Sequence, residues 1–452
     1  MRSELDDLHQ RLAEIAGSDH VMAGPAAAGF AVDGMVPSLA IRPGSQEQTA
    51  AVMTACADAG AAVIPWGGGT SMGLGNPPTR ADVAVILDRL NRIVEHDAPN
   101  LTVTVEAGVR LDDLQAALGE RKQFLPLDPP TYGKATIGGI LTANASGPSR
   151  LLYGTARDWV LGMQVVLPDG APMRCGGKVI KNVSGYDMNK LFIGSLGTLG
   201  IITEATFKLL PVPAAFSVVT GLFGQIGQAA SVLVSVLDSA LLPEALELFD
   251  PDAVALLGPR LGLEATGYGV AVALSGSPQV VERQARDFAA LFRGADARET
   301  VTLSSERAAT SWRAVTNVFD LLPVAPADRI VCKITTHISR TADMLEAARR
   351  LGRRHRLRAV VLAHAGSGVV RACYLLGPDA PPAETLAGSF EELRCEAQRA
   401  EGSLVLHQAP RDLKAHADAW GKPGGGFDLM RRLKAEFDPR NLCNPGRFLG
   451  GL

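Results

Sequence analysis

The stretch 63-VIPWGGGTSMGLG-75 decides how the first half of the chain is interpreted. An apolar run ends in three consecutive glycines at 67–69, and Thr70 and Ser71 follow them. Glycine loses more backbone entropy on ordering than any other residue, so three in a row need a reason. One reason is a tight surface turn. The other is a backbone that passes close to a phosphate, because consecutive N–H groups form an anion-binding concavity and the two hydroxyls add donors.

The known phosphate motifs do not match this loop. It contains no GxxxxGK[ST] pattern, so it is not a Walker loop, and it lacks the GxGxxG spacing of the Rossmann fingerprint. Considered alone, the loop therefore leaves both the surface turn and the phosphate site open.

Two further glycine clusters follow in the same half of the chain. They are KATIGGILTANASGPSRLLYGTARDWVLG at 134–162 and GGKVIKNVSGYDMNKLFIGSLGTLGIITE at 176–204. A strand is predicted directly after the second cluster, and its backbone could pair with the polar edge of a planar heterocycle. Turns alone do not require three such clusters, so together they favour a large phosphorylated ligand.

Length and composition exclude several classes of protein. At 452 residues the chain predicts two or three domains, and 47% hydrophobic with 20% charged residues is typical of a soluble globular protein. A formal net charge of −3 argues against nucleic acid and anionic membranes as partners. The six cysteines form no CxxC pair, which argues against an iron–sulfur or structural zinc site. We expect a cytoplasmic location, because the N-terminus is polar and no apolar run approaches the ~18 residues of a membrane span.

The order of predicted elements divides the chain into four segments. We expect an N-terminal helical arm over 1–35, a cofactor-binding domain over 36–213, an α+β cap over 214–410, and a C-terminal helix and tail over 411–452. Pro211 and Pro213 mark the boundary between the second and third segments. No internal repeat is visible in the sequence.

The combination PWGGGTS, TIGG…NASGP…YG…RD and KNVSGYD…GSLGTLGIITEATFKLLP resembles the FAD-binding domain of flavoprotein oxidases of the vanillyl-alcohol oxidase (PCMH) type. Within that group it is most similar to the FAD-binding subunit of bacterial glycolate oxidase and its 2-hydroxy-acid dehydrogenase relatives. The closing segment DAWGKPGGGFDLMRRLKAEFDPRNLCNPGRF resembles the same subunit. The resemblance implies an α+β fold, in which a PCMH-type FAD-binding domain of two α/β subdomains precedes an α+β cap with an antiparallel sheet.

The same resemblance implies which residues hold FAD. The pyrophosphate would lie on the glycine loop, made of Pro65, Gly67, Gly68, Gly69, Thr70 and Ser71. The residues expected along the pyrophosphate and flavin are Thr136, Gly138 and Gly139, with Asn144 and Ser146 beside them. Those expected near the adenine are Gly194, Gly197, Thr198 and the backbone of Ile202, while Asn444 would return toward the flavin ring. The loop has no histidine for covalent attachment, so non-covalent FAD is predicted, with Lys181 and Arg447 as candidate cations near flavin N1.

Relatives that oxidise 2-hydroxy acids carry an HxGDGNxH stretch and a later EH pair, which resemble a divalent-metal site. This chain has HAGSGVVRA, with His364 first, Ser367 in place of the aspartate and Arg371 where the second histidine is expected. The later pair is replaced by VLHQAP, which keeps His407 without an adjacent glutamate. We therefore predict no metal site, since two histidines without a nearby carboxylate make a poor set of ligands.

Three functions remain open at this point. The first is an FAD-binding, electron-relaying subunit of a glycolate oxidase-type complex, whose companion flavoprotein subunit oxidises the small 2-hydroxy acid and whose iron–sulfur subunit accepts electrons. Any membrane association would then arise through these partners. The second is a self-sufficient FAD-dependent dehydrogenase, in which Arg371, Lys333 and Arg329 bind a carboxylate and His364 or His337 acts as base. The third is a vestigial flavin domain that serves as an assembly scaffold.

Overall fold

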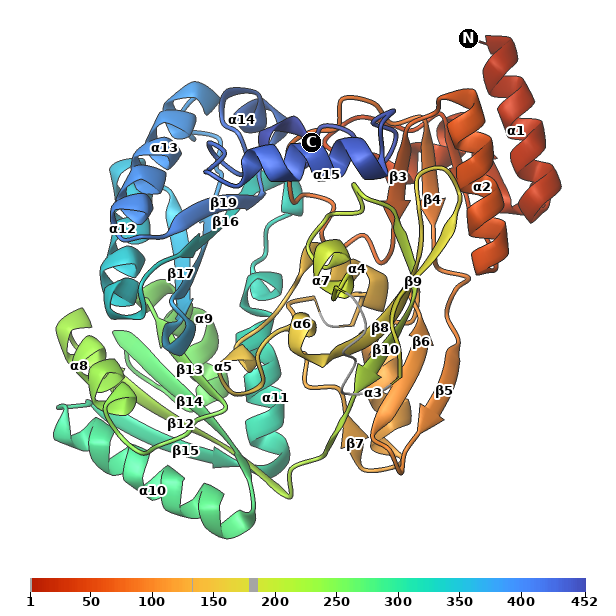
Figure 1. The fold of residues 1–452 in the computed structure, drawn as a ribbon. Helices are drawn as coiled ribbons and strands as arrows, with labels where there is room; N and C mark the ends of the chain where they lie inside the picture. The colour runs from red at the N-terminus through yellow and green to blue at the C-terminus, as the bar shows by residue number, and fades with distance from the viewer. Residues whose placement is uncertain (1, 132, 179–185) are drawn as a thin grey trace. The chain divides into compact units, whose positions relative to one another are not determined.

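The computed structural model describes residues 2–131, 133–178 and 186–452, and the chain forms two compact units in it (Figure 1). Unit 1 comprises Met1–Ala145, Thr155–Pro211 and Asp418–Leu452. Unit 2 comprises Ser146–Gly154 and Val212–Ala417. A short piece of the second glycine cluster thus belongs to unit 2.

Unit 1 begins with a four-stranded sheet in the order β1-β2-β4-β3. Its strands are β1 (Val21–Ala23), β2 (Leu39–Ile41), β3 (Val63–Trp66) and β4 (Val83–Ile86), with β2 and β3 parallel to β4. Helices α1 (Arg2–Ala16) and α2 (Gln46–Ala59) pack on it through a core that includes Leu12 and Val52. As the sequence predicts, Ser45 caps α2 through its hydroxyl and Gly60 ends the helix in the left-handed region.

The second sheet of unit 1 is antiparallel, in the order β5-β6-β10-β8-β9. Its strands are β5 (Ile93–Asp97), β6 (Thr102–Glu106), β10 (Ile201–Lys208), β8 (Val160–Val166) and β9 (Pro172–Gly176). A separate two-stranded antiparallel sheet is formed by β7 (Gln123–Phe124) and β11 (Leu210–Pro211). The helices of this part are α3 (Leu111–Gly119), α4 (Ile137–Ala143), α6 (Ala156–Trp159), α7 (Asn189–Phe192) and, near the C-terminus, α15 (Phe427–Phe437).

Unit 2 is built on an eight-stranded antiparallel sheet in the order β15-β12-β14-β13-β17-β18-β16-β19. The first half contains β12 (Ala215–Phe223), α8 (Ile226–Leu237), β13 (Ala245–Phe249), α9 (Pro251–Leu261), β14 (Tyr268–Gly276), α10 (Pro278–Gly294) and β15 (Glu299–Ser304). The second contains β16 (Arg329–Thr335), α12 (Thr341–Arg354), β17 (Arg358–His364), β18 (Val369–Leu375), α13 (Ala383–Arg399) and β19 (Ser403–Gln408).

These halves are structural repeats, so the expectation of no internal repeat is wrong at the level of the fold. Each half follows a β-α-β-β-α-β order, and in each the strands lie as fourth, first, third and second from the outer edge inward. The second strands of the two halves, β13 and β17, pair and close the sheet. The halves differ along the chain, because α9 lies between the second and third strands of the first half, where the second half has only the short helix η6 (Ala365–Ser367).

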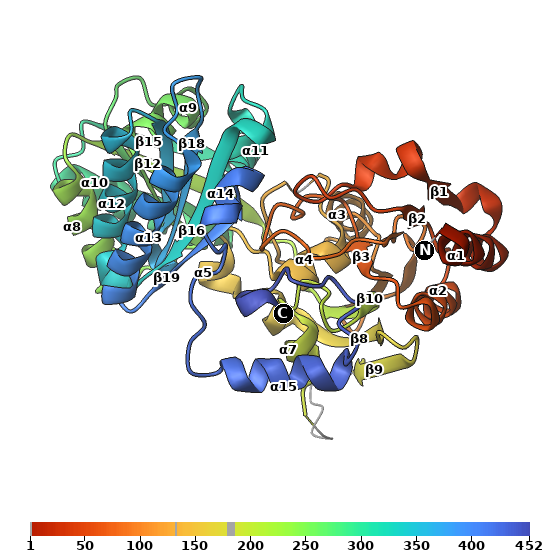
Figure 2. The same ribbon diagram turned by 90° about the horizontal axis from the view of Figure 1, so that it is seen from above.

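Helices cover both faces of this sheet (Figure 2). Helices α10, α12 and α13 pack on one face. On the other face α9, α11 (Ser305–Thr316) and the short helix η3 (Val318–Leu321) bury a cluster that includes Phe249, Trp312 and Leu362. Part of this second face carries the polar side chains described below.

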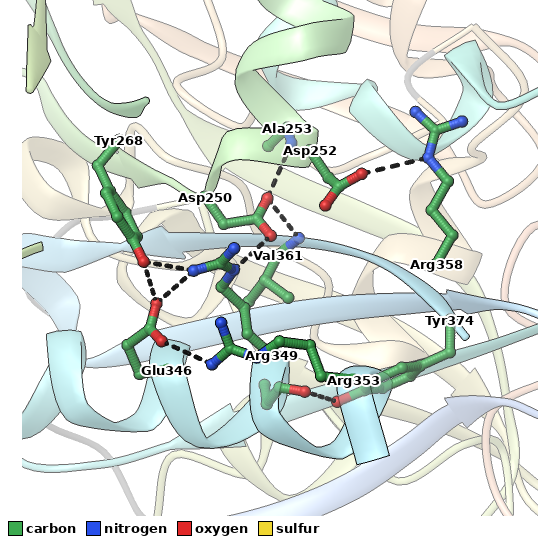
Figure 3. Close-up of polar contacts among 11 residues, drawn as sticks. Asp250, Asp252, Ala253, Tyr268, Glu346, Arg349, Arg353, Arg358, Val361 and Tyr374 are labelled. Carbon is green, nitrogen blue, oxygen red and sulfur yellow. Dashed lines mark hydrogen bonds and ion pairs between the residues drawn. The ribbon is translucent and has the colours of Figure 1, made fainter. Parts of the chain in front are cut away.

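A buried polar network fixes the β13–β17 seam (Figure 3). Where β13 ends, the carboxylate of Asp250 accepts from the backbone N–H groups of Ala253 (2.8 Å) and Val361 (3.2 Å). The same carboxylate accepts from Nε of Arg349 on α12 at 3.1 Å, and Arg349 also pairs with Glu346 at 2.6 Å. Asp250 therefore caps the N-terminus of α9 and bonds the β17 backbone. Through Arg349 it also connects these two elements to α12.

No helix among the described residues is long and apolar enough to cross a bilayer.

Candidate functional site

A pocket in unit 1 opens where β3 gives way to the glycine loop. The residues that line it are Pro65, Gly67, Gly68, Gly69, Thr70, Ser71, Met72, Gly139, Thr142, Ala143, Leu196, Gly197, Asn444 and Arg447. The lining joins the three glycine clusters to the C-terminal segment, although nearly 400 residues separate its ends in the sequence. Part of the lining was not predicted from the sequence. These residues are apolar or weakly polar: Met72, Thr142, Ala143 and Leu196.

Close packing of the chain on itself explains the glycines of the loop. A Cβ on Gly67 would lie 2.3 Å from Oγ1 of Thr136, and a Cβ on Gly68 would lie 1.9 Å from the carbonyl oxygen of Lys134. Oγ1 of Thr136 accepts from the N–H groups of Gly68 (3.3 Å) and Gly139 (3.4 Å). The loop is therefore held against the start of α4, and glycine is needed there whether or not a ligand is bound.

The C-terminal segment closes the pocket through a second set of contacts. Asn444 adopts a left-handed conformation, and its Nδ2 donates to the carbonyl oxygen of Leu196 at 2.5 Å. Nζ of Lys434 donates to the carbonyl oxygens of Thr198 (2.8 Å) and Cys443 (3.0 Å) and pairs with Asp438 at 2.6 Å. These buried contacts tie the third glycine cluster to the end of the chain.

Unpaired polar atoms indicate that the pocket is built for a polar ligand. Of the lining residues, Asn444 has a buried Oδ1 and Arg447 a buried Nε and Nη1 without a hydrogen-bond partner, and Oδ1 of Asn144, next to the lining residue Ala143, is also unpaired. Buried polar groups are almost always paired in folded proteins, so these atoms are the ones a ligand would satisfy. A dinucleotide with amide, hydroxyl and phosphate groups fits acceptors and donors of this kind.

The other expected cofactor residues do not line this pocket. Gly138 packs its backbone on Ala107, and Gly194 donates to the carbonyl oxygen of Leu141. The hydroxyl of Thr198 donates to its own loop at the carbonyl oxygen of Ser195 (2.8 Å), and Ile202 pairs with Val165 of β8. Ser146 falls in unit 2, where its hydroxyl accepts from Arg150 (3.2 Å). Lys181 lies outside the described residues.

Unit 2 carries a row of polar side chains on the sheet face opposite α12. Glu247 of β13 stands opposite His364 of β17, and Arg371 of β18 stands opposite Lys333 of β16. Because Arg371 is also paired with Leu362, two residues before His364, all four side chains point to the same face. The structure thus brings together all three predicted catalytic residues and adds Glu247.

Glu247 and His364 form a buried pair. Nδ1 of His364 lies 2.8 and 2.9 Å from the two carboxylate oxygens of Glu247, and the side chains are only 3% and 0% exposed. Nε2 of His364 is buried without a partner. The expectation that no carboxylate accompanies this histidine holds only along the sequence, since 117 residues separate the pair.

Cations dominate the rest of the row. Helix α5 (Arg150–Tyr153) follows Ser149, whose hydroxyl donates to Glu244 at 2.8 Å, and the charge of Arg150 acts on both His364 and Lys333. Burial and the charges of Arg371, Arg150 and Lys333 hold the pKa of His364 well below its usual value. Burial and the charges of Arg150 and Arg371 lower the pKa of Lys333 to about 8. The neutral imidazole therefore sits beside a positively charged surface, which is suited to an organic anion.

His407 joins the row through an irregularity in the sheet. On β19, Gln408 pairs with Val331 and Leu406 pairs with Cys332, so His407 is an extra residue without a partner on β16. Such β-bulges re-aim side chains and are common next to functional sites. Burial and the charges of Lys333 and Arg371 lower the pKa of His407 to about 3.

Arg329, another predicted substrate contact, lies on the same face of β16 as Lys333, and its charge acts on Arg371. Its guanidinium is already used, because it donates to the carbonyl oxygen of Phe319 (2.8 Å) and to Oε1 of Gln408 (3.3 Å). His337 is exposed where η5 (Ile338–Arg340) begins. Within the described residues no three His, Cys, Asp or Glu side chains gather as a metal-binding group.

Comparison with known proteins agrees with this geometry. Residues 37–176 match the family model of the FAD binding domain, and residues 212–448 match that of the FAD linked oxidases, C-terminal domain. The glycolate oxidase subunit GlcD of Bacillus subtilis is 30% identical over 91% of this chain and 89% of its own length. The mitochondrial cytochrome D-lactate dehydrogenase of Arabidopsis thaliana is 26% identical over 92% and 74%. The solved structure of p-cresol methylhydroxylase superposes with a TM-score of 0.78 at 18% identity, over 99% and 97%.

The chain belongs to the FAD-linked oxidase family. It is an FAD-dependent oxidoreductase with a PCMH-type FAD-binding fold and a C-terminal domain on an antiparallel sheet. The fold class, the family and the FAD cofactor that the sequence predicts are thereby confirmed.

Proposed function

We propose that this chain is an FAD-dependent dehydrogenase of small 2-hydroxy acids that binds its substrate on the polar row of unit 2. The observation that carries the proposal is the buried Glu247–His364 pair beside the cations Arg371 and Lys333. A 2-hydroxy acid offers a carboxylate and, on the adjacent carbon, a hydroxyl that loses a proton on oxidation. The glycolate oxidase and D-lactate dehydrogenase names of the relatives support the same substrate class.

Each group of the row has a role in this proposal. Arg371 and Lys333 bind the substrate carboxylate by charge-assisted hydrogen bonds. The Glu247 carboxylate accepts Nδ1–H of His364, which fixes the tautomer in which Nε2 is free to accept the hydroxyl proton. The lowered pKa keeps the Nε2 of His364 unprotonated, and the Glu247 carboxylate balances the positive charge that the imidazole gains when it accepts the proton. Bound FAD supplies the two-electron acceptor for the hydride that leaves C2, and the product is a 2-oxo acid.

In this proposal Arg371 takes over part of the role that the resemblance assigns to a divalent metal. Arg371 stands where the resemblance expects a metal-ligating histidine, and its guanidinium lies over the ring of Phe319 at 4.9 Å. A guanidinium held in this way presents a fixed fork of donors to a carboxylate. That the chain uses no metal stays a prediction.

Stopped-flow reduction under anaerobic conditions tests these roles. The His364→Gln variant should keep its FAD but reduce it about 10²- to 10⁴-fold more slowly with glycolate or D-lactate. The Arg371→Met variant should weaken the apparent substrate affinity about 100-fold. His355→Gln is the matched control, because His355 bonds Ser389 between α12 and α13 (2.7 Å) on the other face. Wild-type rates and affinities in both row variants would refute the proposal.

A relay function is the second candidate. One of the relatives is itself named as a subunit, which favours membership of a complex. The companion flavoprotein subunit and the iron–sulfur subunit are what the resemblance implies. The absence of any CxxC pair from the sequence requires that such a cluster be carried by another chain. In this case the isolated chain holds FAD and stays oxidised with substrate until the partner subunits are added. A pure protein that cannot bind FAD would instead support the scaffold interpretation.

A further inference from the structure

Arg447 is a buried guanidinium at the end of the chain with an unusually fixed position. It is 2% exposed and lies in unit 1. Its Nη2 donates to the carbonyl oxygens of Met72 (2.8 Å) and Leu74. Its own carbonyl oxygen accepts from Nε1 of Trp420 (2.9 Å) and from the backbone N–H of Asn76 (3.0 Å). The side chain is therefore held on the loop that follows the three glycines.

The remaining donors of this guanidinium have nothing to bind. Nε and Nη1 are buried and make no hydrogen bond, and burial lowers the pKa of Arg447 to about 10. The charge of Asp33 opposes that shift without bonding either nitrogen. Buried charges in stable proteins are normally paired, so a cation with two unused donors indicates a missing anion.

The pocket identifies that anion. Arg447 lines the same pocket as the glycine loop, whose backbone N–H groups and the hydroxyls of Thr70 and Ser71 are donors as well. The pyrophosphate is the part of FAD that is charged in every redox state, whereas the flavin ring is neutral when oxidised. We propose that Arg447 is the counter-charge for the FAD pyrophosphate, and not a cation that tunes the flavin ring. This inference concerns the cofactor, so it does not depend on the substrate proposed above.

The test compares two cofactor fragments on apo-protein from which FAD has been removed. ADP carries the pyrophosphate without the flavin, and adenosine carries neither. In Arg447→Met, the affinities for FAD and ADP should fall about 10- to 100-fold while that for adenosine changes less than about threefold. In Arg447→Lys, which keeps the charge, the loss should be smaller. The midpoint potential of the bound flavin should stay at its wild-type value.

Arg440→Met is the matched control, since Arg440 is an exposed arginine of the same C-terminal segment that donates to the carbonyl oxygen of Ala57. It should leave all three affinities unchanged. Equal losses for ADP and adenosine in Arg447→Met would overturn the proposal, because they indicate a purely structural role. Unchanged ADP affinity with a shifted flavin potential would also overturn it, because the charge would then act on the ring. If Arg447→Met does not fold, Arg447→Gln replaces it. Equal ADP affinity in wild type and Arg447→Gln would then overturn the proposal.

Discussion

Among single residues, Lys333 makes substrate binding depend on pH through its charge state. The cation that binds the substrate carboxylate is present below its pKa of about 8 and is lost as the pH rises through that value. We predict that kcat/KM for the hydroxy acid falls above pH 8 because KM rises. In Lys333→Arg the fall should disappear, since arginine keeps its charge beyond pH 12. The same fall in both proteins would show that another group titrates.

Gly68 provides the second residue-scale prediction. A Cβ there would lie 1.9 Å from the carbonyl oxygen of Lys134, so Gly68→Ala must push the loop off the start of α4. We expect Gly68→Ala to lose FAD on gel filtration and to lower the free energy of unfolding by about 2 kcal/mol or more. Gly119→Ala is the control, because no atom lies within 4 Å of a Cβ at that position. Equal FAD content in the two variants would contradict the close-packing explanation.

Sequence reasoning reached some site residues and not others for a physical reason. His364 and Arg371 can be predicted because they fall in a stretch that departs from a known motif, whereas Lys333 is suggested only by its charge, which suits a substrate carboxylate. Glu247 was missed because nothing near it in the sequence marks it, and only the pairing of β13 with β17 sets it beside His364. The sequence shows the charge of Arg447, whereas its unpaired donors depend on the folded chain.

At the scale of elements, the seam between the two sheet halves depends on a buried ion pair. Asp250 and Arg349 are 0% and 14% exposed, whereas Asp252 and Arg358 form a similar pair at 41% and 45% (Figure 3). We predict that Arg349→Met lowers the free energy of unfolding by about 3–5 kcal/mol, because it leaves the Asp250 carboxylate buried without its cation. Arg358→Met should change it by at most about 1 kcal/mol.

Urea unfolding followed by circular dichroism measures both variants. Similar midpoints would mean that the buried pair contributes no more than the exposed one. Loss of the β13–β17 pairing would also separate Glu247 from His364. Glu247 lies three residues before Asp250, and His364 lies three residues after Val361. Arg349→Met should therefore slow flavin reduction more than Arg358→Met at a temperature where both remain folded.

The elements themselves were largely predictable. Local signals such as Ser45, Gly60 and the two prolines after β10 act through neighbouring residues, so their effects can be read along the chain. The repeat in unit 2 could not be predicted in this way. It depends on which strands become neighbours, and apolar strands of similar length carry little information about pairing partners.

At the scale of the whole molecule, the account assigns cofactor binding to unit 1 and substrate binding to unit 2 of one chain. In this arrangement the isolated chain oxidises the substrate, whereas a relay subunit receives its electrons from another protein. The distinction depends on whether the chain alone can carry out the whole oxidation.

Anaerobic mixing of the purified, FAD-loaded chain with glycolate and with D-lactate tests this most directly. The flavin absorbance near ~450 nm reports the redox state without any partner subunit. The account predicts that at least one of the two acids bleaches the flavin of the isolated wild type, and that His364→Gln bleaches far more slowly. A flavin that stays oxidised with both acids, and is reduced only after companion subunits are added, would contradict it and establish the relay function.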